Sequence, residues 1–162
     1  MITSGDDDQV ICWDPTNRCK SGSTYVSKES NEESKGGAST LSKLPASKQS
    51  RCVASNDKYL AVAGNDGTVT IREHENYDNP YKTISDSKDW IEVMAFSPCN
   101  SMLAIGSHDN CIYIYKTDDF SLKGKMDMHS SYITALDWSK DSAWIRSNCG
   151  AYELLFTRTD TV

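Results

Sequence analysis

No part of the 162-residue sequence contains the roughly 18–20 consecutive apolar residues that a membrane-spanning helix needs. The first residues, Met1-Ile-Thr-Ser-Gly-Asp-Asp-Asp, also lack the basic and apolar start of a secretory signal. Positive charge is scarce, because 17 Lys and Arg stand against 23 Asp and Glu, for a net charge of −6. We therefore expect no membrane partner, no general binding to nucleic acid phosphates, and no unaided electrostatic adhesion to an acidic surface.

The six cysteines form no C-x-x-C pair, and none of the three histidines lies at zinc-finger spacing from them. Cys52 and Cys111 lie inside apolar runs, where a free thiol behaves as a small hydrophobic side chain. Asp6-Asp7-Asp8 lacks the alternating spacing of a calcium loop and is interpreted as a charged hairpin turn. The sequence thus predicts reduced structural cysteines in a cytosolic protein, with no metal and no cofactor.

A change in composition divides the chain. Residues 20–50 hold nine serines among 31 residues and few large apolar side chains. Such a segment cannot bury enough surface to offset its backbone entropy, so we expect a flexible insertion. The alternative is a contact controlled by phosphorylation of its serines.

Short apolar runs separated by turn residues lie on the C-terminal side of this segment. Tyr59-Leu-Ala-Val-Ala-Gly, the turn Asn65-Asp-Gly and Thr68-Val-Thr-Ile predict a β-hairpin, because Gly supplies the positive φ of a tight turn. Met102-Leu-Ala-Ile-Gly and Cys111-Ile-Tyr-Ile-Tyr predict a second hairpin. No long stretch has the 3.6-residue apolar period of a helix, so the expected fold is all-β.

The second hairpin repeats the first at an offset of 43 residues, and a third copy follows at 42. Matched pairs include Leu60 with Leu103, Asp66 with Asp109, Ile71 with Ile114, Leu103 with Ile145 and Ile114 with Phe156. A period of about 40–45 residues with several short strands is typical of WD40 propeller blades. We expect partial blades at 1–19 and 129–162 and full four-stranded antiparallel blades at 51–87 and 88–128.

The strands support stacked blades. Trp90-Ile-Glu-Val-Met-Ala-Phe, apart from Glu92, and Cys111-Ile-Tyr-Ile-Tyr are apolar at both alternating sets of positions. A sheet covered on one side would alternate apolar with polar residues. Other sheets should therefore cover both faces of these strands.

Four collinear motifs resemble the echinoderm microtubule-associated protein-like (EMAP-like) family: Trp90 to Pro98, Gly106 to Tyr115, His129 to Asp141, and Ser147 to Phe156. The resemblance implies tandem β-propellers and association with tubulin or microtubules. In that family, attachment resides mainly in an N-terminal coiled coil and a hydrophobic HELP segment, and neither is in this sequence. The resemblance thus implies part of a microtubule-associated protein, with further blades needed to close the ring, rather than a tubulin-binding surface.

The candidate site residues fall into two groups. His129 occupies the position of the WD-repeat His that caps a blade; since Ala151 stands where a turn Asp would, we expect an incomplete network around it. Asp66 and Asp109 are expected to bond their own turns. Trp90, His108 and Tyr132 lie near inner-strand entrances and are candidate partner contacts, by analogy with the fold. Trp138 and Trp144 are expected to pack within blades.

No grouping of a nucleophile with a base stands out in the sequence, so we predict no catalytic residues and no enzyme. The predicted function is a scaffold segment that presents rim loops to proteins, in the cytoplasm and cytoskeleton, with the ciliary axoneme as one setting. The alternative is a general WD40 adaptor in a ciliary or ubiquitin-ligase complex without direct tubulin contact.

Overall fold

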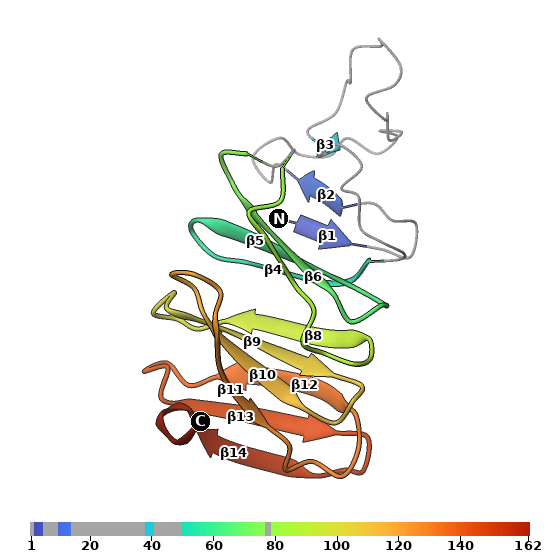
Figure 1. Ribbon diagram of the computed structural model, residues 1–162, viewed down its shortest axis with the longest axis vertical. Coiled ribbons are helices and arrows are strands. Elements are labelled where there is room, and N and C mark those ends of the chain that lie inside the picture. Colours follow the sequence, from blue (N-terminus) through green and yellow to red (C-terminus); the bar gives the residue numbers. More distant parts are fainter. Residues whose placement is uncertain (1, 5–9, 14–37, 41–49, 77–78) are drawn as a thin grey trace.

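A computed structural model describes residues 2–4, 10–13, 38–40, 50–76 and 79–162 (Figure 1). The strands in these ranges are β1 (Ile2–Ser4), β2 (Val10–Trp13), β3 (Ala38–Thr40), β4 (Ser50–Ser55), β5 (Tyr59–Gly64), β6 (Val69–Glu73), β7 (Lys82–Ile84), β8 (Ile91–Phe96), β9 (Met102–Ser107), β10 (Ile112–Lys116), β11 (Leu122–Met126), β12 (Ile133–Trp138), β13 (Trp144–Cys149) and β14 (Leu154–Arg158). A short 3-10 turn, η1 (Thr159–Thr161), follows β14. Within these ranges, no helix has the length and apolar character to cross a membrane.

The strands form four antiparallel sheets in sequence order. Two have four strands, β4-β5-β6-β7 and β8-β9-β10-β11, and two have three, β1-β2-β3 and β12-β13-β14. Figure 1 shows the sheets stacked along the molecule, and β4, β8 and β12 contact one another in succession as the innermost strands. The predicted all-β fold of two full and two partial blades is confirmed.

The turns repeat with the strands. The hairpins that follow β5, β9 and β13 place Gly67, Asn110 and Tyr152 at φ of +78°, +68° and +63°, and these residues recur at the predicted offsets. A Cβ on Gly67 would lie 2.8 Å from the carbonyl oxygen of Asp89. The positive φ and this close approach therefore both require glycine at position 67. The Asp-Gly turn predicted from the sequence is therefore present.

The structure differs from the prediction of one flexible insertion over residues 20–50. Ala38–Thr40 forms β3, which pairs with β2, and Ser50 begins β4. Backbone hydrogen bonds to an existing sheet can hold a short polar strand, which a composition argument cannot detect. Residues 20–37 and 41–49, with seven of the nine serines proposed for phosphorylation, lie outside the described residues.

Apolar side chains fill the spaces between sheets rather than one central core. Leu103 and Ile105 of β9 join a cluster with Ile71 and other side chains of the β4–β7 sheet, while Ala104, between them, joins a second cluster with Ile145 of the last sheet. The middle strands of the two four-stranded sheets are thus buried on both faces, as their sequence predicts, whereas β13 of the last sheet is buried on one face only. Trp144 lies on that open face and is 41% exposed beside Arg158, so the expectation that it packs within a blade is wrong.

Candidate functional site

Three aromatic rings and one guanidinium line up across three sheets at the end where the inner strands begin. Arg51 of β4 lies over the Trp90 ring at 4.2 Å, Trp90 lies 4.6 Å from His108, and His108 stacks on Tyr132 at 4.5 Å with an interplanar angle of 18°. We call Arg51, Trp90, His108 and Tyr132 the rim row. Trp90 and Tyr132 immediately precede β8 and β12, and His108 follows β9.

The rim row unites the three contact candidates named from the sequence. Each belongs to a different loop, and the packing of β4, β8 and β12 around one axis brings those loops together. Sequence reasoning missed Arg51, because the small residues of Cys52-Val-Ala did not identify β4 as an inner strand. β4 and β8 are each the first strand, in chain order, of a four-stranded sheet. This equivalence identifies β4 as an inner strand and places Arg51 at the same end as Trp90.

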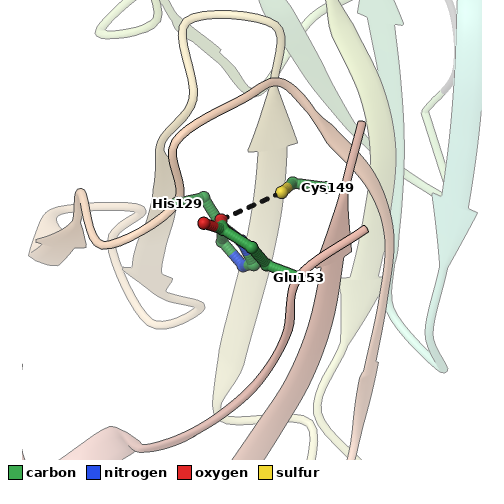
Figure 2. A group of neighbouring side chains, drawn as sticks. All are labelled: His129, Cys149 and Glu153. Atoms are coloured by element: carbon green, nitrogen blue, oxygen red, sulfur yellow. Dashed lines mark hydrogen bonds and ion pairs between the residues drawn. The ribbon is translucent and has the colours of Figure 1, made fainter. Parts of the chain in front are cut away.

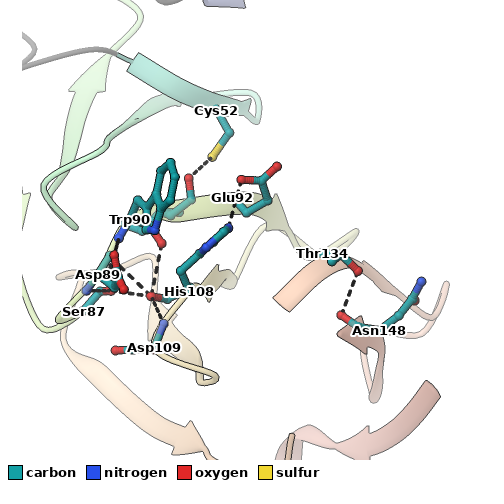
Figure 3. Close-up of polar contacts among 11 residues, drawn as sticks. Cys52, Ser87, Asp89, Trp90, Glu92, His108, Asp109, Thr134 and Asn148 are labelled. Atoms are coloured by element: carbon teal, nitrogen blue, oxygen red, sulfur yellow. Dashed lines mark hydrogen bonds and ion pairs between the residues drawn. The ribbon is translucent and has the colours of Figure 1, made fainter. Parts of the chain in front are cut away.

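The rim row is polar at its sides and accessible to solvent. Tyr132 is 43% exposed, and the Nε2 atom of His108 lies 3.3 Å from a carboxylate oxygen of Glu92 (Figure 3). Aromatic rings flanked by charged groups can contribute both apolar area and directional polar contacts to a protein interface. The rim row thus exposes groups of the kind found at protein interfaces.

Asp109 holds the neighbouring loop from within its turn. One carboxylate oxygen accepts hydrogen bonds from the Tyr113 hydroxyl at 2.7 Å and the Lys88 amide at 3.1 Å, and the other accepts from the Cys111 amide at 3.2 Å. Partial burial opposes ionisation, but these hydrogen bonds outweigh it and lower the pKa of Asp109. In the preceding hairpin, the Asp66 carboxylate accepts bonds from the Thr68 amide at 3.0 Å and hydroxyl at 2.6 Å.

His129 has a carboxylate neighbour, contrary to the expectation drawn from Ala151. Its Nε2 atom lies 2.7 Å from the Ser147 hydroxyl, and its Nδ1 atom lies 3.4 Å from Glu153. Glu153 accepts hydrogen bonds from the Ser130 amide at 2.9 Å and from the Ser130 hydroxyl at 2.7 Å. In the preceding blade, Asp109 likewise accepts a hydrogen bond from the Lys88 amide. Hydrogen bonds from the amide and hydroxyl of Ser130 and from the Cys149 thiol lower the pKa of Glu153 to about 2.

The sequence showed no grouping of hydroxyl, imidazole and carboxylate, yet Ser147, His129 and Glu153 form one. Such an order is that of a nucleophile, its base and an orienting acid. Ser147 is 1% exposed and His129 8% exposed, so a substrate carbonyl has no approach to the hydroxyl. The arrangement is suited to capping the sheet, not to acyl transfer.

Cys149 completes a second grouping around the same imidazole. The ligand atoms of His129, Cys149 and Glu153 all lie within 4.8 Å of one another (Figure 2). The sequence predicted no metal ligands, since these residues come from three separate segments without zinc-finger spacing. Asp6-Asp7-Asp8, the other metal alternative, lies outside the described residues.

Comparisons with known proteins agree with this architecture. The family described as the echinoderm microtubule-associated protein second beta-propeller matches residues 1–162. The chain is 48% identical over 160 residues to the ciliary WD repeat-containing protein ctxp80 of Euplotoides octocarinatus, covering 96% of this chain and 22% of that protein. It is 50% identical over 76 residues to human echinoderm microtubule-associated protein-like 1, covering 44% of this chain and 9% of that protein.

A solved structure adds evidence on the fold alone. A chain in the crystal structure of a mitotic checkpoint complex superposes with a TM-score of 0.74 at 15% sequence identity, over 99% of this chain and 45% of that one. The chain spans about a fifth of the length of ctxp80 and less than a tenth of the length of human echinoderm microtubule-associated protein-like 1. With its blade repeat, its radial sheets and a family match over its whole length, the chain belongs to the family of the second β-propeller of echinoderm microtubule-associated proteins.

Proposed function

We propose that this chain is a non-enzymatic scaffold segment whose rim row binds protein partners of a microtubule-associated protein. The observation that carries the proposal is the continuous row of contacts from Arg51 through Trp90 and His108 to Tyr132. Buried aromatic and Arg side chains commonly dominate binding energy at protein interfaces. The Ser147 hydroxyl, enclosed beneath the sheet end, supports a role without catalysis.

In this proposal, the full-length parent protein associates with microtubules, and the association does not rest on electrostatic attraction of this segment to tubulin. A segment of charge −6 has no general electrostatic attraction to the acidic exterior of tubulin. The names of its relatives, a ciliary protein and microtubule-associated proteins, support a cytoskeletal location with the ciliary axoneme as one setting. The alternative, an adaptor in a ciliary or ubiquitin-ligase complex, differs in requiring no tubulin in the bound complex.

Co-sedimentation of the full-length parent with purified microtubules tests the association. We expect the parent in the microtubule pellet, and its absence there would contradict the microtubule proposal. If affinity capture of the parent yields another complex free of tubulin, the adaptor alternative is favoured.

A matched pair of tryptophan variants tests the rim row. Trp90→Ala should remove partners from the captured complex, because it breaks the stack at its centre. Trp144→Ala is the control. Trp144 is also an accessible tryptophan beside an arginine, but it lies at the end of the β12–β14 sheet that is farther from Tyr132. Equal partner recovery with wild type and Trp90→Ala would contradict the role of the rim row.

A further inference from the structure

The group of His129, Cys149 and Glu153 joins three different donor atoms at one sheet end. His129 precedes β12, Cys149 ends β13 and Glu153 precedes β14. The His129 and Cys149 side chains are nearly enclosed, and the Glu153 side chain is about one-third exposed. We propose that these three residues form a zinc-binding site.

The imidazole offers an unused ligand atom. His129 Nδ1 is buried and has no hydrogen-bond partner, because Glu153 at 3.4 Å is not aligned to accept a bond from it. A buried nitrogen without a partner costs free energy that a bound cation would recover. Nε2 faces Ser147 at 2.7 Å, so donation from Nε2 to that hydroxyl leaves the Nδ1 lone pair directed at the site.

The donor set and its spacing suit Zn²⁺. Zinc in proteins binds thiolate, imidazole and carboxylate, with bonds of about 2.0–2.3 Å, so neighbouring ligand atoms in a tetrahedron lie about 3.4–3.6 Å apart. Glu153 Oε2 lies 3.4 Å from His129 Nδ1 and 3.1 Å from Cys149 Sγ. Small side-chain movements would bring all three within bonding distance of one ion.

The surroundings hold the ligands in place and leave an entrance. The Ser130 amide and hydroxyl fix the Glu153 carboxylate. Cys149 and Glu153 also line a surface cavity of about 500 Å³ together with Tyr132, Asn148 and Tyr152. A metal ion can enter from this cavity, where a water molecule can supply the fourth ligand.

Without metal, the Cys149 thiol donates a hydrogen bond to Glu153. Zinc binding replaces that thiol proton, which passes to solvent, and leaves a thiolate–zinc bond. No oxidation or reduction takes place. The competing interpretation is therefore a purely hydrogen-bonded cap with the same three side chains.

Titration of the 162-residue chain with Co²⁺ under reducing, oxygen-free conditions tests the site, because cobalt takes zinc's place and reports thiolate ligation by a near-ultraviolet charge-transfer band. We expect one Co²⁺ per chain, displaced by Zn²⁺, with this band present. Cys149→Ser should abolish the band, and Ser147→Ala should weaken the affinity by about 10–100-fold through misorientation of the imidazole. Cys99→Ser removes an exposed thiol elsewhere and should change neither the charge-transfer band nor the affinity for Co²⁺.

Thermal unfolding gives a second readout that does not depend on the spectrum. Zn²⁺ should raise the Tm of wild type and of Cys99→Ser, but not that of Cys149→Ser or Glu153→Gln. Absence of stoichiometric binding, or a charge-transfer band that persists in folded Cys149→Ser, would overturn the proposal. Either result would favour the interpretation of these side chains as a hydrogen-bonded cap. Neither would test the proposal that the rim row binds partners.

Discussion

A carboxylate can reach the same backbone amide from two different positions in a blade. Asp109 does so from within its hairpin turn, whereas Glu153 does so from the residue before β14. The 42-residue offset pairs Asp109 with Ala151 and therefore misses Glu153. The additional methylene of Glu compensates for its different starting point, which a residue-by-residue repeat cannot show.

Asp109→Asn should lower the free energy of unfolding by about 1–3 kcal/mol at neutral pH, because a charged acceptor of three hydrogen bonds becomes neutral. Because folding lowers the pKa of Asp109, its stabilisation is present above the unfolded-state pKa near 4 and is lost as pH falls through the folded value. The difference between wild type and variant should therefore shrink below about pH 4 in denaturant titrations.

Asp118→Asn is the control for the loss of one negative charge. Asp118 is exposed in the segment between β10 and β11, so its substitution should change the free energy of unfolding by less than about 0.5 kcal/mol. Equal destabilisation by both substitutions would show that net charge, not the Asp109 hydrogen bonds, determines the effect.

Cys99 should be alkylated more than tenfold faster than Cys52 at neutral pH. Partial burial opposes ionisation of Cys99, but hydrogen bonds from Ser101, Ser142 and Ser97 outweigh it and lower its pKa to about 6. Burial raises the pKa of Cys52 to about 12. The thiolate is the reactive form, so of these two cysteines Cys99 is the one largely ionised at pH 7.

Peptide mass spectrometry after timed iodoacetamide treatment measures each rate. The Cys99 rate should change little between about pH 7 and 8.5, because its thiol is already ionised, and Ser101→Ala should restore a rise with pH. A steep rise in wild type would contradict this prediction. Fast labelling alone would not indicate an enzyme, since serine hydroxyls around Cys99 supply no general base.

At the scale of elements, periodic apolar residues locate the middle strands well. The hairpin arms predicted from Tyr59 and Met102 begin at the first residues of β5 and β9. The four-stranded blades were predicted, but the sequence did not locate the outer strands β7 and β11, because they are short, partly exposed and held largely by backbone bonds to one neighbour. Pattern analysis detects burial, so strands with little burial escape it.

Gly106 lies where three strands approach closely. A Cβ added there would lie 2.7 Å from a methyl carbon of Ile133 and 2.8 Å from one of Val93, well inside normal contact. Gly106→Ala should therefore lower the free energy of unfolding by about 1–3 kcal/mol through overpacking between β9, β8 and β12. Denaturant unfolding followed by circular dichroism measures it.

Lys140→Ala provides the comparison for Gly106→Ala. Lys140 is exposed in the turn between β12 and β13, so its loss should change stability by less than about 0.5 kcal/mol. A Gly106→Ala variant as stable as wild type would show that the two neighbouring side chains can move aside without cost.

At the scale of the molecule, the 43- and 42-residue repeats determine which faces are buried. The repeat predicts that sheets stack, and the contacts of β4 with β8 and of β8 with β12 place the apolar clusters between them. The site could be predicted only in part: the fold analogy selected Trp90, His108 and Tyr132, but their stacking distances depend on how three sheets turn around the axis. The His129 grouping depends on the same rotation and was not predicted.

The same substitution, Leu to Ala, at two positions compares a side chain buried between sheets with one on the open face of the last sheet. Leu103 is fully buried between the two four-stranded sheets, whereas Leu154 of β14 is 55% exposed. Leu103→Ala should lower the free energy of unfolding by about 2–5 kcal/mol, because it removes apolar contacts and leaves a cavity between sheets. Leu154→Ala should cost less than about 1 kcal/mol, since that face of the β12–β14 sheet contacts no other described sheet. Equilibrium denaturation of both variants measures the difference. Similar losses would mean that a second copy or another partner covers the exposed face in solution, and repeating the measurement at several protein concentrations would identify self-association.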